Sequence, residues 1–154
     1  MKDAIKLYLD LCSIQRPLDR QDQLRIVLES EAVLGILAFC AAGSAELVSS
    51  ETLVFEAGRT PDEKRKKHSI SALSLSRVFV KLSASIEARA KQLQNEGLKT
   101  MDSFHVASAE HGHAEYFCTC DDRLIKRTKT LKSVKMKMGT PVELAEEIER
   151  WKSK

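Results

Sequence analysis

The chain has few aromatic residues, little net charge and no long apolar run. Only 5% of its 154 residues are aromatic, which argues against a broad platform that stacks nucleic-acid bases. The formal net charge is +3, so the chain is not a histone-like polycation, although a local basic face remains compatible with it. No window of the sequence approaches the roughly 20 apolar residues that a membrane-spanning helix needs. These absences leave a globular protein that is long enough for a real core.

The first residues, MKDAIKLYLDLCS, do not resemble a signal peptide, because Asp3 and Asp10 interrupt a short apolar run. We therefore expect a cytoplasmic protein whose four cysteines are thiols. The sequence contains no repeat, low-complexity segment or internal linker, and we expect a single domain over residues 1–154.

Strand and helix patterns alternate along the whole chain. Strand patterns occupy residues 5–13, 45–49, 77–83, 114–120 and 134–138, and in the first of them Ile5, Leu7 and Leu9 alternate with Lys6, Tyr8 and Asp10. Helix patterns occupy residues 23–43, 50–59, 84–97, 100–112, 121–132 and 140–151, and a further helix opens at residues 60–63. The alternation predicts a three-layer α/β/α sandwich with a mainly parallel central sheet of about five strands.

Two helices share the same start signal. The sequences TPDE at 60–63 and TPVE at 140–143 each place Thr as the N-cap, Pro at the first helical position and Glu where it can reach back to the cap. We expect a capping box at both positions.

Four acidic residues follow predicted strands in a way that can bring them together. Asp10 and Asp121 end the first and fourth strand patterns, Glu56 lies on the helix after the second, and Asp102 lies in the first turn of the helix that leads into the fourth. Functional groups of parallel sheets gather at the carboxyl ends of the strands. Clustered carboxylates repel one another, and Mg²⁺ or Mn²⁺ would relieve that repulsion and could activate water beside a phosphate.

Each acid also has a plain structural alternative. Asp102 could favour the helix dipole from the first turn, and Asp121 or Asp122 could be an N-cap. Asp10 could be an ordinary strand-end residue and Glu56 a solvated helix residue. Only their joint occurrence after strand ends favours a site.

Four stretches of the chain resemble the PIN-domain family, including its VapC-type ribonuclease toxins and their solitary relatives. They are KLYLDLCSIQRP, LVSSETLVFEAGR, LKTMDSFHVASAEHGHAEYFCTCDD and VKMKMGTPVEL, and the resemblance runs from about Ile5 to Leu144. The third stretch is the most specific, with an Asp, small helical residues and an aromatic strand that ends in Thr-x-Asp. The resemblance implies a PIN-like fold and a metal-dependent endoribonuclease that uses Mg²⁺ or Mn²⁺.

Carried over residue by residue, the resemblance assigns catalysis and metal binding to one quartet, which consists of Asp10, Glu56, Asp102 and Asp121. Glu56 is preferred to Glu51 because the family's acid closes the helix pattern, and Asp121 is preferred to Asp122 because it completes the Thr-x-Asp motif. Asp122 remains an accessory metal-ligand candidate. The candidates for substrate contacts are Arg16, Thr119 and His105. The chain departs from its relatives after Asp10, where Leu11 and Cys12 replace a small hydroxyl residue and Asn.

Other residues allow competing interpretations. His111, His113, Cys118 and Cys120 suggest zinc, but structural zinc sites usually place two to four residues between their cysteines, and here there is one. The basic tract at 64–67 and the lysines and arginines at 126–137 could attract phosphate, or could simply be solvated. Arg16, in the loop after Asp10, is better placed to touch a scissile phosphate.

Three hypotheses therefore stand: a metal-dependent endoribonuclease acting on RNA, a catalytically weak or inactive PIN-fold module that binds RNA or protein, and a structural zinc protein. The family resemblance further implies a homodimer and, if the chain is a toxin, a small antitoxin partner.

Overall fold

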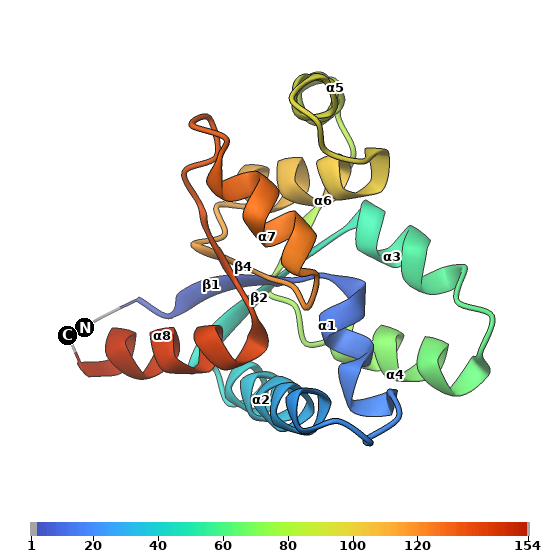
Figure 1. Ribbon diagram of the computed structural model, residues 1–154, viewed down its shortest axis with the longest axis vertical. Helices are drawn as coiled ribbons and strands as arrows, with labels where there is room; N and C mark the ends of the chain where they lie inside the picture. Colours follow the sequence, from blue (N-terminus) through green and yellow to red (C-terminus); the bar gives the residue numbers. More distant parts are fainter. Residues whose placement is uncertain (1–2, 154) are drawn as a thin grey trace.

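A parallel sheet of five strands forms the centre of the computed structural model, which describes residues 3–153 (Figure 1). The strands run in the order β3-β2-β1-β4-β5, and every neighbouring pair is parallel. Their bounds are β1 (Ile5–Leu9), β2 (Ala45–Ser50), β3 (Val78–Val80), β4 (Tyr116–Cys118) and β5 (Lys137–Gly139). The predicted three-layer architecture with a parallel five-stranded sheet is confirmed.

Helices cover both faces of this sheet. They are α1 (Leu11–Gln15), α2 (Leu24–Ala41), α3 (Glu51–Gly58), α4 (Glu63–Leu73), α5 (Ala84–Asn95), α6 (Thr100–His111), α7 (Asp122–Lys129) and α8 (Pro141–Ser153). Helices α2 and α8 pack together on one side, and α5 packs on α6 on the other (Figure 1). Helices α1, α3 and α4 contact one another where β1 and β2 end. No helix within residues 3–153 has the length and apolar character to cross a membrane.

The first strand is buried on both faces, which differs from the predicted alternation. Tyr8 is as inaccessible as Leu7 and Leu9, and its ring stacks on Phe117 with the ring centroids 5.2 Å apart. A parallel sheet covered by helices on both sides makes such strands apolar throughout. The strand is also shorter than expected. Asp10 leaves it and accepts a hydrogen bond from the Ser13 amide, so that α1 begins at Leu11.

The two expected capping boxes have different outcomes. At 140–143 the Glu143 carboxylate accepts from the Thr140 amide at 3.0 Å, and the Thr140 hydroxyl accepts from the Glu143 amide at 3.2 Å, so this prediction is confirmed. At 60–63 the prediction is wrong. Asp62 is the N-cap there, because its carboxylate accepts from the Arg65 amide at 3.0 Å, and α4 starts at Glu63.

Candidate active site

The order of the strands decides which acidic residues can meet. Strands β1 and β4 are neighbours, and Asp10 and Asp121 follow their carboxyl ends. Strand β2 lies on the other side of β1 and leads into α3, which carries Glu56. Asp102 projects from the first turn of α6. All four residues of the predicted quartet therefore belong to elements around one end of the sheet.

Asp10 is fixed by three kinds of donor. It is the N-cap of α1, and one carboxylate oxygen accepts from the Ser13 amide at 3.2 Å and from the Cys12 thiol at 3.1 Å. Burial raises the pKa of Asp10, and a hydrogen bond from Thr119 counteracts part of that effect. The carboxylate is thus largely removed from water but well supplied with donors.

Cys12, at the position where the family resemblance led us to expect Asn, contributes directly to this arrangement. A hydrogen bond with Cys120 is the chief reason that the pKa of the Cys12 thiol is raised, so the thiol keeps the proton that it donates to Asp10. Its sulfur also lies 3.5 Å from the Thr119 hydroxyl oxygen. Cys12 therefore replaces the expected polar contact with a weaker donor.

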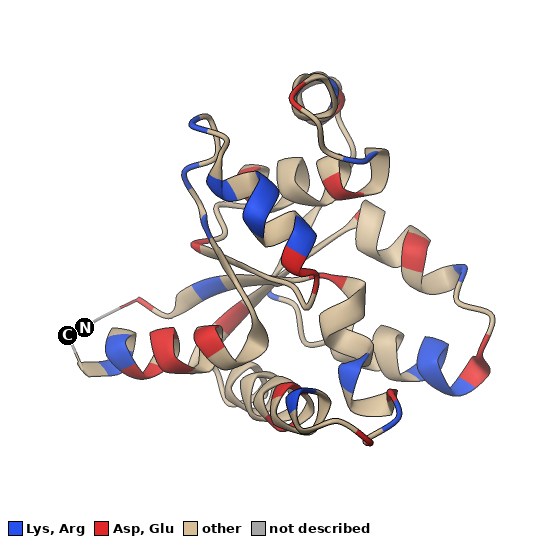
Figure 2. Cartoon of the chain, in the orientation of Figure 1, with Lys and Arg blue, Asp and Glu red and all other residues tan. Residues whose placement is uncertain are grey.

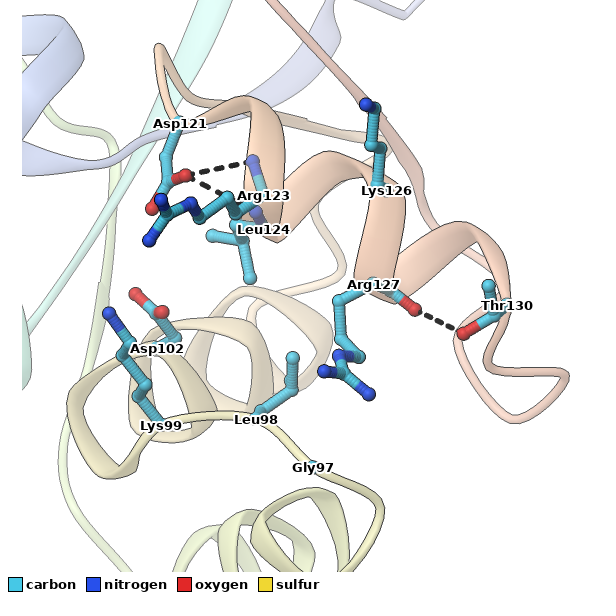
Figure 3. Close-up of a pocket in the computed structure, with 10 residues that line it drawn as sticks. All are labelled: Gly97, Leu98, Lys99, Asp102, Asp121, Arg123, Leu124, Lys126, Arg127 and Thr130. Carbon is cyan, nitrogen blue, oxygen red and sulfur yellow. Dashed lines mark hydrogen bonds between the residues drawn. The ribbon is translucent and has the colours of Figure 1, made fainter.

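Asp121 and Asp102 face the same hollow from two helices (Figure 3). Asp121 is the N-cap of α7 and accepts from the amides of Arg123 at 2.9 Å and Leu124 at 3.3 Å, through the same oxygen. Its own amide donates to the Thr119 hydroxyl. Burial raises the pKa of Asp102, and the negative charges of Asp121 and Asp10 add to that effect. The three aspartates thus share one negative region.

Glu56 is held by a chain of buried polar groups. Its carboxylate lies 3.0 Å from Nε2 of His105, and Nδ1 of His105 lies 2.7 Å from the Tyr8 hydroxyl. The Tyr8 hydroxyl is in turn 2.8 Å from the hydroxyl of Ser50, which is the N-cap of α3. If Tyr8 donates to Nδ1, then Nε2 carries the proton and donates to Glu56. The chain fixes both the start of α3 and the acid on its last turn.

The alternative acids have other partners. The Glu51 carboxylate accepts from the Leu82 amide at 3.0 Å, which ties the segment after β3 to α3. Asp122 forms a two-pronged ion pair with Arg25 of α2, with distances of 2.7 and 2.9 Å. This hydrogen bonding lowers the pKa of Asp122. As an accessory ligand, Asp122 would have to release Arg25.

The three candidates for substrate contacts are all engaged within the protein. The guanidinium of Arg16 donates to Glu29 at 2.7 and 2.9 Å and to Asp19 at 3.2 Å. Thr119 and His105 are buried, and both act on the acids rather than on the surface. For all three, a direct contact with substrate remains a prediction.

The histidines and cysteines of the zinc interpretation belong to different parts of the structure. Cys118 is buried in β4, where its thiol donates to the Ser13 hydroxyl, whereas His111 and His113 line a separate hollow beside β3. All four cysteines of the chain are free thiols.

The acidic residues suit a divalent cation by their chemistry. Within residues 3–153, no three side chains of His, Cys, Asp or Glu are arranged so that they could jointly hold a metal ion. Asp102 and Asp121 nevertheless line one hollow, and beside burial the charges of Asp121 and Asp10 raise the pKa of Asp102. Carboxylate oxygens are the ligands that Mg²⁺ and Mn²⁺ prefer. The donor set therefore fits, and the side chains would have to draw closer to coordinate one ion.

Sequence reasoning missed two groups of residues in this region. The first is the pair Tyr8 and Ser50, although a Tyr in a buried strand needs a partner for its hydroxyl, and that need was a usable signal. The second is the pair Lys99 and Arg123, which line the hollow of Asp102 and Asp121 together with Lys126 and Arg127 of the predicted basic tract. Lys99 and Arg123 lie outside the basic tracts, and no local pattern singles them out.

Comparisons with known proteins place these observations in context. The family model described as PIN domain matches residues 11–130. No curated protein matches the chain in a sequence comparison. Three similar solved structures share between 12 and 17% identity with it, a level at which the likeness concerns the fold.

The three are FitAcB from Neisseria gonorrhoeae, VapBC2 from Rickettsia felis bound to a promoter DNA fragment, and VapC20 from Mycobacterium tuberculosis, described as a sarcin-ricin loop cleaving toxin. FitAcB is 17% identical with a TM-score of 0.56, over 88% of this chain and 97% of that one. VapBC2 is 12% identical with a TM-score of 0.58, over 88% and 98%. VapC20 is 12% identical with a TM-score of 0.51, over 77% and 92%.

Proposed function

The chain belongs to the PIN-domain family, and from this premise we propose that it is a metal-dependent endoribonuclease. The observation that carries the proposal is geometric: Asp10 and Asp121 follow the ends of the neighbouring strands β1 and β4, and Asp102 lines the same hollow as Asp121. VapC20, described as a sarcin-ricin loop cleaving toxin, supports a cleavage reaction.

The residues of the site divide the work of phosphodiester hydrolysis among them. Asp10, Asp102 and Asp121 would hold Mg²⁺ or Mn²⁺, with Glu56 as the fourth acid. A bound divalent cation supplies activation of water and neutralisation of charge on the phosphate. The Ser13 amide and the Cys12 thiol hold Asp10 in place, and His105 holds Glu56. Water would attack the phosphorus in line and the bond to the 3′ oxygen would break, leaving a 5′-phosphate and a 3′-hydroxyl.

A cleavage assay with matched variants tests the proposal. The purified chain should cut RNA with Mn²⁺ and not after chelation, and Asp10→Asn and Asp102→Asn should each lower the rate at least a hundredfold. Asn is also a good N-cap, so Asp10→Asn should preserve the start of α1. Asp62→Asn on α4 removes one carboxylate from a distant N-cap and should leave the rate unchanged. Cleavage that persists in both active-site variants would reject the assignment.

A non-catalytic role is the second candidate. It is favoured by Cys12, which donates to Asp10 where relatives supply Asn, and by the separation of the acids within residues 3–153. A module of this kind would bind RNA or a protein without cutting RNA. Tight RNA binding that needs no metal, together with no cleavage at any Mn²⁺ concentration, would support it over the nuclease.

We further propose that the chain is the toxin of a toxin–antitoxin pair. VapC20, which has a similar fold and is described as a toxin, supports this role. A partner with an Arg side chain would suit the negative region, since a guanidinium bonds paired carboxylates in two-pronged fashion. Expression of the chain alone should then arrest growth of a bacterial host, and Asp102→Asn should abolish the arrest. Normal growth with active nuclease in the extract would reject the toxin role and leave the nuclease in place.

A further inference from the structure

A groove extends from the aspartates along α7. It has a volume of about 460 Å³ and lies between α7 and the turn that joins α5 to α6. Asp102 and Asp121 lie at one end in the view of Figure 3, and Arg127 and Thr130 lie toward the other. The buried residues Leu98 and Leu124 contribute apolar surface between them.

Four cations line this groove, and we call them the groove cations: Lys99, Arg123, Lys126 and Arg127. All four are exposed, and none forms an ion pair with a carboxylate within residues 3–153. By contrast, Arg25 and Arg89 each form an ion pair with a carboxylate. Figure 2 shows the basic residues following one another along α7, directly after the acidic residues at its start.

Arg127 reaches across the groove from α7. Its Nη1 lies 3.1 Å from the position that a Cβ atom at residue 97 would occupy, so the guanidinium rests on the turn where Gly97 has no side chain. Figure 3 shows this side chain directed from α7 toward that turn. Arg127 is six residues beyond Asp121, which corresponds to about 9 Å along a helix axis. The guanidinium is therefore near the aspartates but forms no ion pair with Asp102 or Asp121.

Lys99 provides positive charge at the acidic end. It precedes Asp102 by three residues, or about one helical turn, and its charge counteracts part of the rise in the pKa of Asp102. In Figure 3 the Lys99 side chain lies alongside that of Asp102. A phosphate that approached the aspartates would therefore meet positive charge at both ends of the groove.

We propose that this groove binds the sugar-phosphate backbone of single-stranded RNA on one side of the cleaved bond, with Lys99 and Arg127 on phosphate oxygens and the leucines against ribose. The proposal rests on the proposed nuclease function and adds the path of its substrate. None of the residues that line the groove is aromatic, so contacts to the backbone are favoured over stacking of bases. A volume typical of a pocket for one small molecule suits a nucleotide unit rather than a duplex.

Salt dependence of binding measures the phosphate contacts directly. Each phosphate contact on a single strand contributes about 0.7 to the slope of log K against log salt concentration. The test uses Asp102→Asn as the parent, so that RNA is not cut, and a short fluorescent oligouridylate followed by anisotropy. Lys99→Gln with Arg127→Gln in this parent should weaken binding about tenfold and lower the slope by about 1.4.

A matched control removes the same charge from another helix. Lys64 and Lys67 are exposed on α4, and Lys64→Gln with Lys67→Gln should leave affinity and slope close to those of the parent. If the double groove variant melts at a lower temperature than its parent, Lys99→Gln and Arg127→Gln are measured singly, and each should lower the slope by about 0.7.

The outcomes separate the groove from the nuclease. An unchanged slope in the groove variant, or an equal fall in the control, would overturn the groove proposal even if the wild-type chain cuts RNA. A slope that falls as expected in a chain without Mn²⁺-dependent cleavage would support the groove and reject the nuclease. Equal affinity for duplex RNA would overturn the assignment to single strands.

Discussion

His105 contacts Glu56, and we propose that it acts on the candidate site through that carboxylate. It is buried between the Tyr8 hydroxyl at 2.7 Å and the Glu56 carboxylate at 3.0 Å. Partners of this kind orient ligating groups, and their loss commonly costs 10- to 100-fold in activity or metal affinity, as an order of magnitude. These contacts favour a positioning role for His105 over a direct contact with substrate.

Replacing His105 should therefore separate turnover from binding. We expect His105→Ala to lower kcat for RNA cleavage by about tenfold or more while KM changes little, because Glu56 loses its donor. His105→Gln, whose amide can still donate to Glu56, should recover part of the loss. A KM that rises with an unchanged kcat would instead indicate that His105 touches RNA.

At the scale of single elements, the end of α5 depends on one glycine. Gly97 has a φ of +107°, and the amide of Leu98 donates to the Leu93 carbonyl at 3.0 Å in the manner of a Schellman motif. Only glycine adopts such a backbone conformation without steric cost.

Gly97→Ala should accordingly lower the free energy of unfolding by about 1–2 kcal/mol. The added methyl group would also meet the Arg127 guanidinium. Gly35→Ala in α2 is the matched control of opposite sign, since nothing lies within 4 Å of a methyl group there and helix propensity should add about 0.5–1 kcal/mol. Urea unfolding of both variants measures the difference.

Helix α8 is tied to β5 by a charged contact that should depend on pH. The Lys137 ammonium lies 3.0 Å from the Glu147 carboxylate, and this hydrogen bond lowers the pKa of Glu147 from its ordinary value of 4.5. A lowered folded-state pKa stabilises the fold above the unfolded pKa, and the gain is lost as the pH falls through the folded value. Glu147→Gln should flatten the pH dependence of stability below about pH 5. If stability depended on pH equally in the variant and in the wild type, the contact would have no such effect.

Local sequence predicted most elements, and each exception has a physical cause, which is local at 60–63 and long-range at Tyr8. The motif at 140–143 caps α8 as expected because Val142, its third residue, cannot act as an N-cap. At 60–63 the third residue is Asp62, which is an equally good cap and takes the role from Thr60. Burial of Tyr8 followed from the helices on both faces of the sheet, and the pattern of one strand cannot report them.

At the scale of the whole molecule, exposed apolar residues suggest how two copies meet. Val54 and Phe55 on α3, Phe79 on β3 and Leu82 beyond it are all exposed. The Glu51–Leu82 hydrogen bond places the segment after β3 against the start of α3, so these residues belong to one region. Apolar surface of this kind marks contact sites when it is contiguous.

We predict a homodimer that uses this region, and Phe55→Glu should convert it to a monomer because the partner surface would have to bury a charge. Leu34→Glu places the same charge at an exposed apolar site on α2 and should leave the dimer intact. Sedimentation at micromolar concentration reads both results. A monomeric mass for the wild-type chain would contradict the prediction.

Only part of the candidate site could be predicted from the sequence. Asp10 and Asp121 were predictable because parallel topology brings the ends of neighbouring strands together. The groove was not, since Lys99 and Arg127 come from helices whose relative placement is set by long-range packing. Only the folded chain puts Arg127 against Gly97.

The aspartates of the candidate site differ in whether they also cap a helix. Asp10 and Asp121 each cap the start of a helix, whereas Asp102 caps none, and no hydrogen bond to its carboxylate is found within residues 3–153. If the chain is the proposed nuclease, a descendant that lost this activity would still be under selection to keep Asp10 and Asp121, or an Asn in their place, because both cap helices. Asp102 would be free to drift. Among related sequences, the residue at this one position should therefore be the most informative sign of whether catalysis has been retained.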